Sequence, residues 1–223
     1  MSLSSTRPPN ILFVMVDQLG AATLSCYGGG VPSTPTLVRW AETGTRFTRC
    51  YASVAVCAPN RATILTGRSP VAHGLSANNL HLDPRTPTYA HALRTVGYRL
   101  GGFGKFHQTS MALPLPEDMG FLGFDESVPT EDPRLGPWLE WVAEAHPEHY
   151  QAALATCWPM PYLTSGERQA WQTAFDEHLK PLKDASPWPL MYPSPLPPEV
   201  QQSHWITDLG LDFMARHLDA HPE

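Results

Sequence analysis

Side chains of the kinds that carry out catalysis occur at three separate points of this 223-residue chain. Asp17 directly follows the apolar run Ile11–Val16, Cys57 directly precedes a helix-like segment, and Lys105 and His107 follow a strand-like segment. Ligands of open α/β sheets bind beyond the carboxyl ends of the strands. A single buried Cys is usually inert, and an isolated Lys or His is usually a solvated surface group. The shared strand-end position of a carboxylate, a nucleophile and two cationic groups is what indicates a catalytic site.

The elements needed to position these residues alternate along the chain. Ile11–Val16 is continuous in apolar character, which is typical of a strand buried on both faces of a parallel sheet. Thr34–Gly44 predicts a short helix with a capping Thr, Pro in the first turn and Gly at the end. Alternating strands and helices predict a doubly wound sheet. The further predicted elements are a strand over Arg46–Tyr51, helices over Pro59–Leu65 and Thr88–Val96, a strand over Tyr98–Phe103, and helices over Leu135–Ala145, Thr164–Leu179 and Ser203–Ala220.

The stretch from about residue 108 to residue 200 differs in composition from the rest. It contains Trp138, Trp141 and Trp158, and residues 181–198 hold seven prolines, which predicts an irregular or extended backbone. Two interpretations remain open for this Pro- and Trp-rich insertion. It is either a lid over a binding site or a long insertion whose aromatic residues serve packing.

Composition limits the classes of function. A net charge of −6 argues against nucleic acid and anionic membrane as partners, although a few local cations can still bind an anionic substrate. The four cysteines show no Cys-x-x-Cys spacing, so neither a zinc site nor a disulfide framework is indicated. No segment approaches the roughly 20 apolar residues that span a bilayer. We expect a cytoplasmic protein, and an exported protein whose leader lies outside this sequence is the alternative.

Three motifs occur in the order and spacing of a known family. Cys57–Arg61 has the pattern Cys-x-Pro-x-Arg and continues into Thr66-Gly67-Arg68, and Gly97–His107 ends in Gly-Lys-aromatic-His. Pro9–Gln18 is an apolar run that ends in an acidic residue. From Pro9 to His107 the sequence therefore resembles the type I sulfatases of the alkaline phosphatase superfamily.

The resemblance implies a modified nucleophile and a metal. Cys57 would be oxidised by the formylglycine-generating enzyme to Cα-formylglycine, whose hydrated aldehyde is the nucleophile of that family. Asp17, Gln18 and the modified Cys57 would bind a divalent cation, with Ca²⁺ expected and Mg²⁺ or Mn²⁺ as alternatives. The substrate would be a small-molecule sulfate monoester, which makes the implied activity that of a sulfuric ester hydrolase.

The resemblance also assigns roles to four other residues. Arg61 would hold the formylglycine diol, and Lys105 would pair with the sulfate oxygens as charge builds up. His107 would hydrogen-bond the second hydroxyl of the diol and help remove its proton. Asn78 occupies the position at which the choline sulfatase and phosphonate monoester hydrolase branches use an Asn to contact substrate.

One position departs from the common sulfatase pattern. Many sulfatases have two consecutive acids after the first strand, whereas here Gln18 follows Asp17. The Gln18 amide either coordinates the cation or makes a contact one shell further out. An Asp-Gln pair is similar to the choline sulfatase and phosphonate monoester hydrolase branches, so a phosphonate monoester or phosphodiester hydrolase is the alternative enzyme. A catalytically silent anion-binding module is the alternative that is not an enzyme.

The resemblance implies an α/β fold, namely the N-terminal portion of the alkaline-phosphatase-like sulfatase sandwich, with a mixed, mostly parallel sheet and helices on both faces. The family's remaining metal ligands lie downstream of the matched region. We therefore expect residues 1–223 to be the N-terminal part of a single catalytic domain whose C-terminal remainder is absent. We also expect the chain alone to bind metal poorly and to lack turnover.

Overall fold

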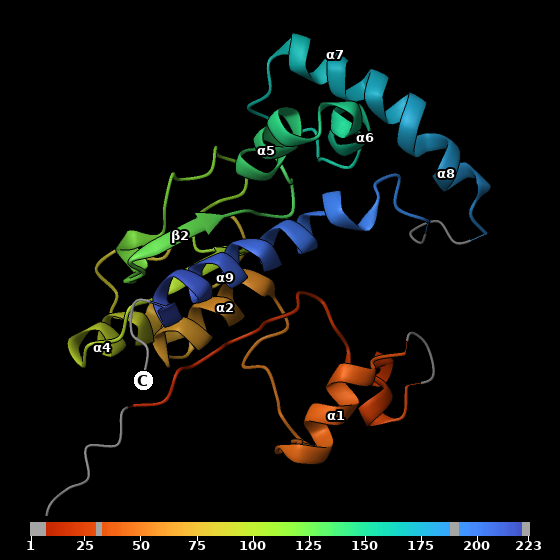
Figure 1. The fold of residues 1–223 in the computed structure, drawn as a ribbon. Coiled ribbons are helices and arrows are strands. Elements are labelled where there is room, and N and C mark those ends of the chain that lie inside the picture. Colours follow the sequence, from red (N-terminus) through yellow and green to blue (C-terminus); the bar gives the residue numbers. More distant parts are fainter. Residues whose placement is uncertain (1–7, 30–32, 188–191, 220–223) are drawn as a thin grey trace, which may run out of the picture. The chain divides into compact units, whose positions relative to one another are not determined.

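The computed structural model of the protein describes residues 8–29, 33–187 and 192–219. The chain divides into two units, Met1–Tyr51 and Ala52–Glu223 (Figure 1). Each unit has its own local architecture. The first consists of short helices and irregular segments, and the second contains the sheet and most of the helices.

The first unit is built around one α-helix, α1 (Pro35–Thr43), which is preceded by the 3₁₀ turns η1 (Ala21–Thr23) and η2 (Ser25–Tyr27). Pro35 begins α1 and Gly44 follows its end, as the sequence predicts. Thr34 takes the N-cap position but makes no capping hydrogen bond. The backbone N–H groups of Ser25 and Thr34 instead donate to each other's hydroxyl oxygens, both at 3.1 Å, which joins η2 to the start of α1.

The two strands predicted in the first unit are wrong. Ile11–Val16 has no strand assignment and its side chains are largely exposed, with Phe13 at 59% and Leu12 at 67%. Arg46–Tyr51 is likewise irregular and exposed. A strand exists only where a neighbouring strand accepts and donates its backbone hydrogen bonds. Among the described residues of this chain, none pairs with either segment.

The second unit contains a parallel pair of strands, β1 (Gly101–Gly104) and β2 (Glu126–Pro129), with Gly101 opposite Glu126 and Gly104 opposite Pro129. The parallel pair confirms the expected α/β class, and β1 overlaps the strand predicted over Tyr98–Phe103. The Asp125 carboxylate accepts from the Leu100 N–H at 2.9 Å and fixes the start of the pairing.

Two hydrophobic clusters lie on either side of this sheet. One joins α2 (Cys57–Thr66), α4 (Tyr89–Thr95) and the segments around β1, and it encloses Leu75, Phe106 and Phe124. The other joins the helices of the insertion to Val128 of β2 and to helix α9 (Gln202–Asp219). The Phe103 and Phe213 rings pack with centroids 5.7 Å apart, so α9 runs alongside the strands (Figure 1). The expected helices on both faces are therefore present in this unit.

Most predicted helices of the second unit are confirmed, because their ends are encoded locally. Thr88 and Thr164 each accept a hydrogen bond from the third residue of the following helix, which completes two capping boxes. α2 begins two residues earlier than predicted, at Cys57, and the Thr164 helix continues through one π-helical segment into a further α-helix. The bounds are α2 (Cys57–Thr66), α3 (Pro70–His73), α4 (Tyr89–Thr95), η3 (Gly120–Leu122), α5 (Pro137–Ala145), η4 (Pro147–His149), α6 (Tyr150–Ala155), α7 (Ser165–Ala174), η5 (Phe175–Leu179), α8 (Lys180–Ala185) and η6 (Pro198–Val200).

The insertion packs into the hydrophobic cluster that it shares with β2 and α9. Trp138 is 1% exposed and its indole N–H donates to the Val200 carbonyl at 3.1 Å, and Trp141 packs at the edge of the same cluster. These contacts favour packing over a lid as the role of Trp138 and Trp141, whereas Trp158 is 50% exposed. The prediction of an irregular backbone over 181–198 is wrong at its start, because α8 extends to Ala185. Residues 188–191 of that segment and Ala220 of the last predicted helix lie outside the described residues.

Candidate functional site

Cys57 is the first residue of α2, with Val56 as the N-cap. Its thiol donates to Asn78 Oδ1 at 3.5 Å, and the N–H of Ala58 donates to the same oxygen at 3.1 Å. Asn78 follows α3, so the loop after that helix closes over the start of α2. The structure thus brings together two residues, Cys57 and Asn78, that the sequence places in one site from 21 positions apart.

Arg61 lies one turn further along α2, on the same face as Cys57. It is only 6% exposed, and its guanidinium donates to the backbone carbonyl of Lys105. This contact joins the helix that carries the predicted nucleophile to the loop that carries the predicted cationic groups. Arg61 therefore acts here as a structural clamp as well as a local positive charge.

Helix α2 is held in place by a buried histidine. His73 accepts from the Leu75 N–H at Nδ1 (3.1 Å), and its Nε2 lies 3.2 Å from the Thr63 hydroxyl. Burial lowers the pKa of His73, because the charged imidazolium would be desolvated there. The neutral ring ties α3 to α2, so His73 supports the site without being one of its predicted residues.

Lys105 follows β1 directly and pairs with Asp132. Its ammonium donates to both carboxylate oxygens, at 2.8 and 2.7 Å. The Lys105 side chain is 12% exposed and that of Asp132 is 27% exposed, so water screens the pair only in part. The cationic group predicted to bind a sulfate therefore already lies against an anion of this chain.

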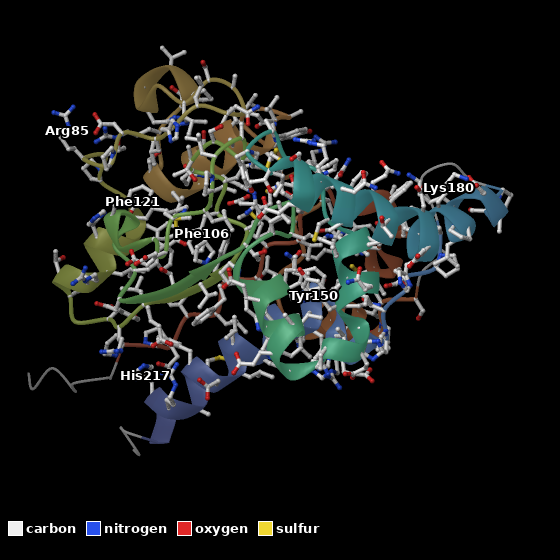
Figure 2. All side chains as sticks on the ribbon, turned by 90° about the horizontal axis from the view of Figure 1, so that it is seen from above. Arg85, Phe106, Phe121, Tyr150, Lys180 and His217 are labelled. Atoms are coloured by element: carbon white, nitrogen blue, oxygen red, sulfur yellow. The ribbon has the colours of Figure 1, made fainter. Side chains whose placement is uncertain are left out.

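His107 is fully buried and adopts a left-handed backbone conformation with φ of +53°. Its N–H donates to Glu131 Oε1 at 2.5 Å, and the N–H of Phe106 donates to the same oxygen at 3.2 Å. Phe106 lies in the interior of the unit, whereas Arg85 lies at its periphery (Figure 2). The loop after β1 is thus anchored by the buried ring of Phe106 and by the carboxyl group of Glu131.

Glu131 is itself 4% exposed. Burial raises its pKa to about 7, and the His107 N–H, Lys105 and Arg61 oppose part of that rise by favouring the ionised form. A carboxyl group with a pKa near neutrality next to cationic groups is typical of functional sites.

Sequence reasoning missed both Glu131 and Asp132. The parallel register explains their position, because β1 and β2 end side by side and the Thr130 N–H donates to the Gly104 carbonyl at 3.0 Å. Residues that follow the two strands therefore meet at one edge of the sheet. The available signal was an acidic pair directly after a short β-like segment, Glu126–Pro129, which was not predicted as a strand.

The predicted metal ligands Asp17 and Gln18 belong to the first unit. They form a turn after the exposed apolar segment, and Gln18 is left-handed with φ of +56°. Oxygen donors of this kind suit a hard cation. Within the described residues, however, no three His, Cys, Asp or Glu side chains gather as a metal-binding cluster. The residues fit such a cation by donor type but not by number.

A hollow of about 300 Å³ lies in the insertion. Its lining includes Leu139 of α5, Tyr150 of α6 and Tyr162 of the segment leading into α7. No predicted site residue contributes to it. Of the helices that the structure describes, none combines the length and the apolar character needed to cross a bilayer.

Comparison with known proteins identifies relatives of the region that carries the site. The family model named Sulfatase matches residues 9–131. Arylsulfatase H of Canis lupus familiaris is 41% identical over 112 residues, covering 45% of this chain and 20% of that protein. The N-acetylglucosamine-6-O-sulfatase of Bacteroides thetaiotaomicron is 38% identical over 105 residues, covering 47% of this chain and 19% of that protein.

A solved structure resembles most of the chain. The phosphonate monoester hydrolase of Silicibacter pomeroyi matches with a TM-score of 0.62 at 23% identity, over 92% of this chain and 38% of that one. This likeness concerns the fold, which is the alkaline-phosphatase-like α/β fold expected from the sequence. The chain spans about a fifth of the length of the curated relatives that it matches. Because the family model covers more than half of the chain and includes Cys57, Lys105 and His107, the chain belongs to the sulfatase family.

Proposed function

We propose that the full-length native protein hydrolyses sulfate monoesters and that Cys57 is the position of its nucleophile. One observation carries the proposal: Cys57 and Arg61, one turn apart on α2, contact Asn78 and the Lys105 carbonyl, which belong to two other segments. Membership of the sulfatase family agrees with this chemistry.

We further propose that Cys57 is oxidised to formylglycine by a formylglycine-generating enzyme. The hydrated aldehyde would supply an oxygen nucleophile that can be regenerated after each turnover. The surroundings of Cys57 fit such a group. The side chain lies at a helix start, is only partly buried, and has the Asn78 amide oxygen within hydrogen-bonding distance.

The cationic residues would stabilise the charge that builds up during hydrolysis. A sulfate monoester is anionic, and its leaving oxygen gains negative charge as the sulfur–oxygen bond breaks. The Lys105 ammonium would bind the sulfate oxygens, in exchange for part of its contact with Asp132. The Arg61 guanidinium, held by the Lys105 carbonyl, would keep a second positive charge close to the Cys57 end of α2.

His107 would hold or move a proton at the nucleophile. It is fully enclosed, so its ring is shielded from bulk water. Proton transfer by a positioned side chain contributes on the order of 10²–10⁴-fold to a rate. The hydrogen bond from its backbone N–H to Glu131 fixes the position of the His107 backbone, from which the ring extends.

We also propose that Asp17, with Gln18, contributes oxygen ligands to a divalent cation, most simply Ca²⁺. The described residues offer fewer donors than the six to eight that Ca²⁺ takes, so no step is derived through the cation. Metal content of the protein isolated from its native host tests the assignment. Asp17→Ala should lower the bound metal, and an unchanged metal content would refute it.

The principal test of the activity compares two substrates. We expect the protein from its native host to hydrolyse 4-nitrophenyl sulfate with a higher kcat/KM than a 4-nitrophenyl phosphonate monoester. Cys57→Ala should abolish the hydrolysis of both. Full activity of Cys57→Ala would refute the nucleophile, and lack of turnover on either substrate would favour a silent anion-binding module.

A phosphonate monoester hydrolase is the second candidate, because Asn78, which contacts Cys57, occupies a position that both the choline sulfatase and the phosphonate monoester hydrolase branches use for substrate. If Asn78 orients a phosphonate, Asn78→Ala should reduce phosphonate hydrolysis more than sulfate hydrolysis. A preference for the phosphonate in the unmodified protein would make this candidate the main activity.

A further inference from the structure

Glu131 contacts the predicted catalytic loop in an unusual way for a buried acid. Its Oε1 accepts two consecutive backbone N–H groups, those of Phe106 and His107. Two successive amides that converge on one oxygen form a small anion-binding concavity. Here the concavity is filled by a side chain of the same chain, supplied by the neighbouring strand end.

The backbone of Glu131 is fixed on both sides of the residue. The Thr130 N–H donates to the Gly104 carbonyl at 3.0 Å, and the Glu131 carbonyl accepts from the Arg134 N–H at 2.9 Å. The Thr130 hydroxyl also accepts a hydrogen bond from Gln202, at the start of α9. The carboxyl group is therefore presented to the loop from a rigid position.

The conformation of His107 needs such a partner. A non-glycine residue in the left-handed region costs of the order of 1 kcal/mol and persists where the surroundings over-determine it. Two hydrogen bonds to one buried oxygen supply that constraint at residues 106 and 107. These hydrogen bonds therefore restrict the direction in which the His107 side chain leaves the loop.

The second carboxyl oxygen shows that packing alone does not explain Glu131. Oε2 is buried and, among the residues that the structure describes, has no hydrogen-bond partner. Burying a polar atom in this state costs free energy that an apolar side chain of similar size would avoid. The residue is thus unfavourable as filler, and its contacts with the loop are its evident contribution.

We propose that Glu131 is the positioning residue of the Lys105–His107 loop. It acts through the hydrogen bonds that Oε1 accepts from the Phe106 and His107 amides, which require the full length of the side chain but not its charge. The adjacent Asp132 holds the Lys105 side chain, so one acid sets the backbone of the loop and the next sets its cation. The inference rests on the proposed function only in treating His107 and Lys105 as site residues.

Two substitutions separate the position of the Glu131 acceptor oxygen from the charge of its carboxyl group. Glu131→Gln keeps an oxygen acceptor at the same distance and removes the charge, whereas Glu131→Asp keeps the charge and withdraws the acceptor by one methylene. Glu144, an exposed acid on α5, supplies the controls Glu144→Gln and Glu144→Asp. Both substitutions at Glu131 conserve polarity and most of the side-chain volume, so the fold should tolerate them.

Hydrogen exchange of the His107 and Phe106 amides is the first measurement, because it needs neither substrate nor modified Cys57. We expect exchange in Glu131→Asp to be at least about tenfold faster than in the unaltered chain. Exchange in Glu131→Gln and in both Glu144 controls should stay within about threefold. If the amides exchange normally in Glu131→Asp but faster in Glu131→Gln, the charge of Glu131 matters. If exchange is accelerated equally in both variants, Glu131 acts only through packing. Either result, or no change at all, overturns the proposal.

The second measurement is hydrolysis of 4-nitrophenyl sulfate by the protein from its native host. Glu131→Asp should lower kcat by about tenfold or more with KM within about threefold, and Glu131→Gln should retain most of kcat. A rise in KM alone would overturn the role in positioning. If the unaltered protein hydrolyses no sulfate ester, the proposed function fails, while the exchange measurement still decides the role of Glu131.

Discussion

Replacing Gly102 by Ala tests how closely the loop that carries His107 is packed onto the sheet. A Cβ atom at residue 102 would lie 2.7 Å from Phe106 Cζ and 2.8 Å from Phe124 Cδ1. These two rings already pack edge to face, with centroids 5.3 Å apart, and are 8% and 9% exposed. Neither ring has open space into which it can move, so the added methyl group must displace Phe106 or the strand.

Overpacking of this kind costs about 1–3 kcal/mol of unfolding free energy. For a chain of this length it should lower Tm by about 2–12 °C. The measurement is thermal unfolding followed by circular dichroism, with urea unfolding as the quantitative check. The displaced ring belongs to the residue before His107, so we also expect the His107 backbone amide to exchange faster.

Gly210 supplies a matched control. It lies within α9, on the other side of the strands, and a Cβ there would meet its nearest neighbour, Phe103, at 4.0 Å. Gly210→Ala should therefore stabilise the chain by about 0.5–1 kcal/mol through helix propensity. If Gly102→Ala is as stable as the unaltered chain, or if both substitutions shift Tm in the same direction by the same amount, the packing argument is refuted.

Three further predictions follow from polar contacts. Asp132→Asn should cost about 1–3 kcal/mol in urea unfolding, because it leaves the poorly exposed Lys105 ammonium without its carboxylate; an unchanged midpoint would contradict this. Because the pKa of Glu131 is raised to about 7 from 4.5, its contribution to stability is complete below pH 4.5 and is lost as the pH rises through about 7. The stability of the unaltered chain relative to Glu131→Gln should therefore fall by up to about 3 kcal/mol over that range, and a flat difference would show that the carboxyl group is not desolvated. Thr164→Ala should cost about 1 kcal/mol and reduce helix content, because it removes the hydroxyl that accepts from the Glu167 N–H.

Local signals in the sequence predicted the helices well. The ends of α1, α4 and α7 are set by residues within a few positions, namely a Thr before the helix and Pro, Gly or a capping-box partner nearby. The resemblance assigns Asn78 a substrate-binding position, and the structure places Asn78 against Cys57, which is a contact that the sequence did not predict.

Strands and their neighbours were predicted less well, because pairing is a long-range property. Ile11–Val16 has the composition of a buried strand, yet among the described residues no neighbouring strand covers it, and it is exposed. The roles of Glu131 and Asp132 depend on the parallel register of β1 and β2, and the acidic pair indicates them only once Glu126–Pro129 is assigned as a strand. The sequence therefore pointed to Cys57, Lys105 and His107 as candidate site residues but not to the acids that hold Lys105 and its loop.

The mass of one tryptic peptide tests the central claim most directly. Cleavage after Arg49 and Arg61 releases the peptide Cys50–Arg61, which contains Cys57 together with the exposed Cys50. In protein from the native host, alkylation should label one cysteine of this peptide, and residue 57 should be lighter than a Cys by about 18 Da, the difference between a thiol and an aldehyde. A peptide in which both cysteines are always alkylated would contradict the proposal that Cys57 becomes the nucleophile of a sulfatase.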